Sequence, residues 1–195
     1  CSTIVEVSGL TNVLHIALGD AHSCALIPNE VRLLDGKIMC WGYNANGQLG
    51  DGTTTRRLTP VQVSGITTAT RISLGVSHSC AVLTDGKVKC WGSNANGQLG
   101  DGTTSDSRTP VEVFGILTAT RIALGGARSC AELINGKVMC WGSNMVGQIG
   151  DGTTQNNRLF PIEIPPPPSL SSASRYSVMT ALVVTIIIQV QSIFT

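Results

Sequence analysis

The apolar residues of this chain fall in short runs separated by turn residues. PVQV (60–63) and PVEV (110–113) alternate apolar with polar positions, as half-buried strands do, and each opens on a proline that is typical of a sheet edge. RISLG (71–75) and RIALG (121–125) are short apolar runs that close on glycine. No stretch of the pattern shows a helical period, so it predicts an all-β fold of short strands and tight turns.

This pattern repeats along the chain. Trp41, Trp91 and Trp141 stand 50 positions apart, and 59–92 matches 109–142 without a gap. An earlier copy, from residue 3 to residue 42, has the same plan with six additional residues, 27–32, which we expect to bulge outward as a loop. Four short strands per unit are typical of β-propeller blades.

Three units predict a partial or incomplete propeller, because propellers typically have four to eight blades. The units cover about residues 3–159, and FPIEI (160–164) begins a fourth. We favour a fragment of a larger propeller, because the chain begins and ends in the same outer strand. Two alternatives remain: identical chains that complete one another, and an open row of blades.

Six of the seven cysteines form three pairs in this pattern. The loop Thr84-Asp85-Gly86 predicts a three-residue hairpin in which 83 pairs with 87, 82 with 88 and 81 with 89. That register places Cys80 opposite Cys90. The corresponding pairs are Cys24 with Cys40, Cys80 with Cys90, and Cys130 with Cys140. We interpret them as cross-strand disulfides, which implies an oxidising compartment; the pairing state of Cys1 stays open.

Zinc is the alternative use of these cysteines. His22 and His78 precede Cys24 and Cys80 by two residues, so each of the first two units offers three ligands where structural zinc takes four. The third unit has Arg128 at the histidine position and keeps both cysteines. We therefore favour disulfides and expect no metal site.

The sequence motif CWGSNANGQLGDGTT (90–104) has near-copies at 40–54 and 140–154. Each copy has one Asp and no Glu, too few acidic ligands for a calcium loop, and its glycines precede no helix, as a phosphate-binding loop requires. We favour a structural role: glycines permit turns, Asn94 or Asn96 tolerates left-handed backbone, Trp packs between blades, and Asp bonds the Thr hydroxyls. The residues assigned to this role are Trp41, Trp91, Trp141, Gly47, Gly97, Gly147, Asp51, Asp101 and Asp151.

A binding surface is expected instead at positions that differ among the copies. These are Tyr43 against Ser93 and Ser143, the triplets 55–57, 105–107 and 155–157, and the inserted residues 27–32.

Composition excludes several functions. With 13 basic and 12 acidic side chains the net charge is +1, which favours no nucleic-acid partner. The three histidines form no catalytic arrangement at recognisable spacing, so we predict neither an enzyme nor a cofactor.

The composition changes after Ile164. We divide the chain into repeats (1–164), a Pro/Ser-rich linker (165–176) and an apolar tail (177–195) that has no charged residue. The tail is long enough to span a bilayer. It also has features of a lipid-anchor signal, and the remaining interpretation is a buried strand or a chance apolar end.

The combination GQLGDGTT, TPVxV and DGKVxCWG over residues 3–164 resembles the repeat of the regulator of chromosome condensation family. The resemblance implies a propeller, most often of seven blades. Members include a guanine nucleotide exchange factor for a nuclear GTPase, a secreted inhibitor of β-lactamase, and modules of larger signalling proteins. The paired cysteines resemble an extracellular or bacterial-type branch.

We therefore expect a non-catalytic binding or scaffold module for a protein or glycan ligand, secreted or displayed at the cell surface, with membrane attachment through the tail as one option. The alternative that the resemblance implies is an exchange factor for a small GTPase. A truncated gene product without independent activity is the third hypothesis.

Overall fold

The computed structural model describes residues 6–29, 34–154 and 156–165. The chain divides into two compact units, Cys1–Ile164 and Pro165–Thr195, and the fold below is that of the first unit. Apart from Pro165, the expected linker and apolar tail lie outside the described residues. Within the described ranges, the structure contains no helix that is long and apolar enough to cross a membrane.

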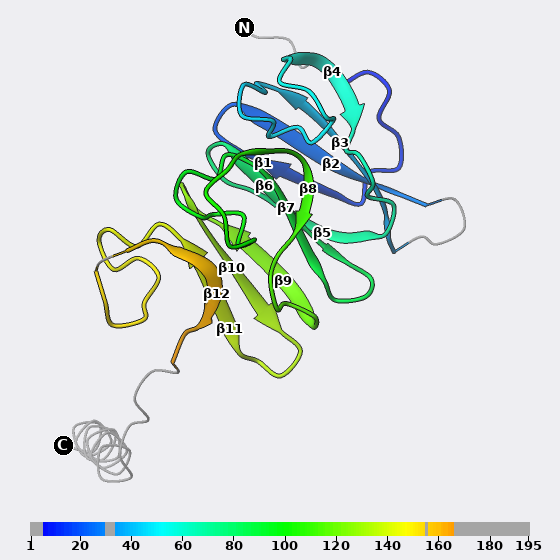
Figure 1. Cartoon of the computed structure of the whole chain (residues 1–195). Coiled ribbons are helices and arrows are strands. Elements are labelled where there is room, and N and C mark those ends of the chain that lie inside the picture. The colour runs from blue at the N-terminus through cyan, green and yellow to red at the C-terminus, as the bar shows by residue number, and fades with distance from the viewer. Residues whose placement is uncertain (1–5, 30–33, 155, 166–195) are drawn as a thin grey trace, which may run out of the picture. The chain divides into compact units, whose positions relative to one another are not determined.

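Twelve strands in the described part of the chain form three four-stranded antiparallel blades, and one residue pair, Gly36 with Ala69, links the first two blades into an eight-stranded sheet (Figure 1). The first blade contains β1 (His15–Leu18), β2 (His22–Pro28), β3 (Gly36–Gly42) and β4 (Arg57–Gln62). The second contains β5 (Ala69–Leu74), β6 (His78–Leu83), β7 (Val88–Gly92) and β8 (Ser107–Glu112). The third contains β9 (Ala119–Leu124), β10 (Arg128–Leu133), β11 (Val138–Gly142) and β12 (Arg158–Glu163). The predicted all-β fold of propeller blades is thus confirmed.

The central hairpin of each blade sets the register. In the second blade Cys80 faces Cys90, Ala81 faces Lys89 and Val82 faces Val88, which confirms the predicted pairing. Gly86 closes the turn with φ of 77°, a left-handed conformation that glycine adopts without steric cost.

The inserted residues of the first unit lengthen its hairpin, so the expectation of a loop over all of 27–32 is wrong at its start. Ile27 and Pro28 continue β2 and pair with Lys37 and Gly36. The extra residues therefore add rungs at the far end of the ladder and leave Cys24 directly opposite Cys40.

The proline-containing strands β4, β8 and β12 lie outermost, each paired with the third strand of its own blade. Their position at the sheet edge agrees with the sequence, because an edge strand has backbone positions where no N–H needs to donate.

The blades pack against one another through two apolar cores. In the first core, Cys24, Leu26, Ile38 and Cys40 of the first blade pack with Ile72, Leu74 and Trp91 of the second. In the second core, Cys80, Val82, Val88 and Cys90 of the second blade pack with Ala119, Ala131 and Trp141 of the third. We call the contact between two neighbouring blades a joint. The side of a blade that carries its two cysteines is its disulfide face, and the opposite side, which carries its tryptophan, is its tryptophan face. Each joint packs the disulfide face of one blade against the tryptophan face of the next.

Candidate functional site

The repeated sequence motif (40–54, 90–104 and 140–154) folds as a loop around one buried asparagine. The side-chain oxygen of Asn94 accepts the amide N–H of Leu99 at 2.9 Å, and its Nδ2 donates to Asp101 Oδ1 at 3.2 Å. Asp101 Oδ1 in turn accepts the amide and hydroxyl of Thr103 at 3.0 and 2.9 Å. The same bonds recur around Asn44 and Asn144. These contacts make the loop rigid without a ligand.

The sequence interpretation of Asn94 and Asn96 as left-handed residues is wrong. Outside glycine, positive φ occurs among the described residues at Asn12 and Asn156. Asn94 acts through its side-chain amide, which can donate and accept at once.

Asp51 and Asp151 accept hydrogen bonds from a threonine of their own loop and from the arginine that opens the following outer strand. Burial acts to raise the pKa of Asp51, but hydrogen bonds from Thr53 and the guanidinium of Arg57 outweigh it, so the pKa lies below its ordinary value. The pKa of Asp151 is also well below its ordinary value, because the Thr153 hydroxyl and then Arg158 bond its carboxylate. These carboxylates therefore serve the turn and are poor candidates for general acids.

The glycines of the loop mark where the next blade approaches. A Cβ added at Gly97 would lie 2.5 Å from Cδ2 of Leu159 in β12, and one at Gly47 would lie 2.7 Å from Cα of Arg108 in β8. Gly47, Gly97 and Gly147 all have φ between 76° and 79°. The first two are therefore required both by the turn and by the contact with the following blade.

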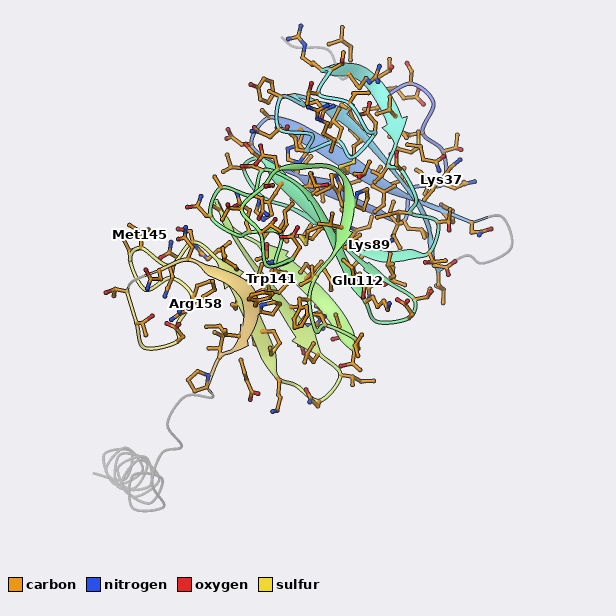
Figure 2. All side chains as sticks on the ribbon, in the orientation of Figure 1. Lys37, Lys89, Glu112, Trp141, Met145 and Arg158 are labelled. Atoms are coloured by element: carbon orange, nitrogen blue, oxygen red, sulfur yellow. A yellow bond between two sulfur atoms is a disulfide. The ribbon has the colours of Figure 1, made fainter. Side chains whose placement is uncertain are left out.

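One backbone carbonyl of the loop binds the next blade directly. The carbonyl of Gln48 accepts the indole N–H of Trp91 at 2.9 Å and the hydroxyl of Ser79 at 2.8 Å. In the second joint the carbonyl of Gln98 accepts the corresponding groups of Trp141 and Ser129, both at 2.9 Å. Figure 2 labels Trp141, which is fully buried in this joint. The loop thus works as a connector between blades, and Trp91 and Trp141 are its anchors.

Two buried histidines complete the joints. His22 Nε2 lies 3.0 Å from Ser79 Oγ, and His78 Nε2 lies 3.0 Å from Ser129 Oγ. Each serine hydroxyl donates its one proton to the backbone carbonyl of Gln48 or Gln98. The hydroxyl oxygen can then only accept from the imidazole, so Nε2 of each histidine carries the proton. Burial lowers the pKa of His22 to about 4. Burial, with a smaller effect of His22, lowers that of His78 to about 3. Both rings are therefore neutral near pH 7.

The structure joins all three predicted cysteine pairs as disulfides: Cys24–Cys40, Cys80–Cys90 and Cys130–Cys140. In each pair the Cα atoms lie 4.1 Å apart, as opposed residues on neighbouring strands do. Sulfurs that are bonded to each other are not zinc ligands, and the neighbouring histidines bond serines instead.

Two of the positions that differ among the copies make hydrogen bonds between neighbouring blades. Tyr43 is exposed, but Asp106 accepts a hydrogen bond from Asn46 of the first blade at 3.0 Å. Asn157 donates to Asn96 of the second blade at 3.2 Å. Asp106 and Asn157 therefore contribute to contacts between blades, and a binding surface at the variable positions stays a prediction. Residues 30–33 of the insert and residue 155 lie outside the described ranges.

Sequence reasoning missed a hollow at the hairpin end of the blades. It has a volume of about 600 Å³, and its lining includes the exposed apolar side chains of Leu34, Leu117 and Ile134. Leu34 and Ile134 stand where the second hairpin has Thr84. The sequence signal that could have revealed this hollow is an apolar residue, Leu34 or Ile134, at the first position of a hairpin turn, where a polar residue is usual.

Three blades joined through repeated loops define a β-propeller repeat protein. The family model described as the regulator of chromosome condensation (RCC1) repeat matches residues 35–82, 85–131 and 135–178, and the chain belongs to this family.

Among curated proteins, human E3 ubiquitin-protein ligase HERC2 is 35% identical over 83 residues, which cover 42% of this chain and 2% of HERC2. The crystal structure of human WBSCR16 matches with a TM-score of 0.68 and 25% identity, covering 79% of this chain and 38% of that one. Yeast RCC1 (Prp20), in its complex with Kap60, matches with a TM-score of 0.69 and 21% identity, covering 83% of this chain and 39% of that one. The chain thus spans well under two thirds of each of these proteins.

Proposed function

We propose that the blades form a non-catalytic protein-binding module that works in an oxidising compartment, secreted or at the cell surface. The use made of the reactive side chains supports the non-catalytic reading. His22 and His78 are buried donors in joints, the loop aspartates bond their own threonines, and the paired cysteines are disulfides. Each of these groups makes at least one structural bond. Among the described residues, Nδ1 of each histidine has no hydrogen-bond partner, but both rings are buried inside a joint, away from any substrate in solution.

The hollow at the hairpin end is the observation that carries the binding proposal. Leu34, Leu117 and Ile134 expose apolar side chains around it. Exposed apolar surface beside a concavity is typical of protein-interaction sites. The lining also carries polar side chains, those of Thr70, Arg71, Thr84, Asp85, Thr118 and Thr120. The three exposed apolar side chains favour a protein partner that inserts an apolar side chain between them.

The compartment is inferred from the disulfides. Cross-strand disulfides persist in oxidising environments and are rare in the cytosol. The exchange-factor alternative has no support beyond the shared fold, because the RCC1 structure with which the likeness is drawn is 21% identical.

The test compares variants of the full chain, produced through a secretory pathway, for binding to a panel of purified extracellular proteins. We expect Ile134→Asp and Leu117→Asp to weaken binding to any recognised partner at least tenfold. Val76→Asp is the control, because Val76 is also exposed but lies in the turn after β5, at the opposite end of the blade. Equal binding by all variants would contradict the proposed surface. Acceleration of nucleotide release from a small GTPase would support the alternative instead.

A further inference from the structure

The first strands of the three blades line a second hollow, which we call the inner-strand hollow. β1 lies beside β5, and β5 lies beside β9 (Figure 1). Residues of all three strands line a volume of about 400 Å³. Propeller blades are arranged around a central channel, and the strands opposite the outer edge form its wall. Additional blades would therefore surround the inner-strand hollow without covering the wall that these strands form.

Each inner strand contributes one basic side chain to this hollow. His15, Arg71 and Arg121 stand at the same position of their units, and all three are exposed. Among the described residues that line the hollow, none is acidic. The net charge of the whole chain is only +1, so this gathering of basic groups is local. A concave wall of one sign of charge focuses the electrostatic field and raises the local concentration of anions.

Two of these basic residues are exposed although their blades are joined to the next one. Alternate residues of a strand share a face. His15 shares a face of β1 with Ala17, which packs against the first core between two blades. Arg71 shares a face of β5 with Ser73, whose hydroxyl accepts the amide N–H of Leu124 in the third blade at 3.2 Å. The neighbouring blade thus contacts each of these faces and still leaves the basic residue open to the hollow.

Both guanidinium groups keep donors for a ligand. Arg71 Nη1 donates to the backbone carbonyl of Thr70 at 2.7 Å, and Arg71 makes no ion pair among the described residues. A guanidinium has five N–H donors in a planar fork that matches a carboxylate or a phosphate. Arg121 Nη1 lies 3.5 Å from the carboxylate of Glu132, and both side chains are exposed. A surface pair of this kind contributes little free energy, so an anionic ligand can replace it.

We propose that the inner-strand hollow binds a small molecule that carries two or more oxyanion groups, phosphate or carboxylate. One group pairs with the guanidinium of Arg71 and another with that of Arg121, while His15 donates a ring N–H. Two groups are required because the two arginines stand on different strands. A volume of about 400 Å³ is that of a small-molecule site. The site is separate from the protein contact proposed at the hairpin end, although Arg71 lines both hollows.

The first test is calorimetric titration of the full chain with pyrophosphate and, separately, with citrate. Physiological ionic strength is used, because it screens single exposed charges. We expect the wild type to bind at least one probe, and the tighter probe identifies the preferred oxyanion. Arg71→Gln and Arg121→Gln should each weaken that binding at least tenfold, because each loses one of the two pairings. Arg56→Gln is the matched control, since Arg56 is also exposed but directly precedes the outermost strand β4.

The second test does not depend on the fold of a variant. Phenylglyoxal modifies exposed arginines, and peptide mass spectrometry gives the rate of modification at each one. Saturation of the wild type with the bound probe should slow the modification of Arg71 and Arg121 and leave that of Arg56 unchanged.

Three results would overturn the proposal. A wild type that binds neither pyrophosphate nor citrate would exclude the site. Equal weakening by Arg56→Gln and Arg71→Gln would show that binding follows the net charge of the chain and not the hollow. Equal protection of all three arginines from phenylglyoxal would likewise place the anion outside the inner-strand hollow.

Discussion

Individual polar groups, both side-chain and backbone, carry the specificity of this fold. Asn94 closes its loop with bonds from both ends of its amide, and the Gln98 carbonyl uses both lone pairs on the next blade. A buried polar group with one bond missing costs about 1–3 kcal/mol, so these contacts select one arrangement of blades.

The buried histidines make stability depend on pH. Unfolded, both titrate near 6.5; folded, the pKa of His22 is about 4 and that of His78 about 3. Below pH 6.5 the unfolded chain binds protons that the folded chain excludes. The free energy of unfolding is therefore level above about pH 7 and falls below 6.5, by up to about 1.4 kcal/mol per pH unit for each histidine.

Denaturant unfolding at pH 7.5 and at pH 5 measures this loss. The double variant His22→Gln, His78→Gln should flatten the dependence in that window, because glutamine keeps an N–H donor without titrating. Equal stability of the wild type at both pH values would mean that the rings are accessible to protons in the folded state.

At the scale of elements, the disulfides differ in their surroundings although their strands pair identically. Cys80 and Cys90 are fully buried in the second joint, whereas Cys130 is half-buried on the open face of the third blade. Access of a reducing thiol should therefore follow blade position.

We predict that dilute protein under graded reductant loses Cys130–Cys140 first and Cys80–Cys90 later. Differential alkylation followed by peptide mass spectrometry gives the order. Loss of Cys80–Cys90 should destabilise the fold by about 2–3 kcal/mol, the value for a closed loop of this length. Simultaneous reduction of both disulfides would contradict this prediction, because it would show that burial in the second joint does not protect Cys80–Cys90 from the reductant.

The local elements were predictable from sequence, and the joints were not. A three-residue loop with glycine at its left-handed position sets the register of a hairpin, so Cys80 opposite Cys90 followed from spacing alone. The joint depends on a backbone carbonyl, Gln48, that meets Ser79 and Trp91, 31 and 43 positions away. Every residue has a backbone carbonyl, so the sequence does not reveal that the one of Gln48 accepts these two hydrogen bonds.

The candidate surface shows the same limit. Leu34, Leu117 and Ile134 come from different parts of the chain, and only the packing of blades brings them to one hollow. Variation among copies does not by itself mark a binding surface, because Asp106 and Asn157 vary while bonding neighbouring blades.

On the scale of the whole molecule, the blades form one unit because each repeated loop is built to fit the next tryptophan. A Cβ added at Gly100 would lie 2.7 Å from Trp141 Nε1, and one at Gly50 would lie equally close to Trp91 Nε1. At Gly150, on the open face, the nearest atom is 3.7 Å away, in Ile164. The motif thus repeats with the joints, because each of its first two copies forms one side of a joint with the following blade.

A double-mutant cycle between Gly100 and Trp141 tests this claim most directly. Gly100→Ala brings a left-handed backbone penalty of about 1–2 kcal/mol together with close contacts to Trp141 and to Val113 Cγ1, and Trp141→Leu removes the two Trp141 atoms from these contacts. The backbone penalty cancels in the cycle, so denaturant unfolding of the four proteins isolates the contact. We predict that the double variant is more stable than the sum of the single changes by about 1 kcal/mol or more. Additivity within about 0.5 kcal/mol would contradict the account, because the loop and the tryptophan would then not be in contact.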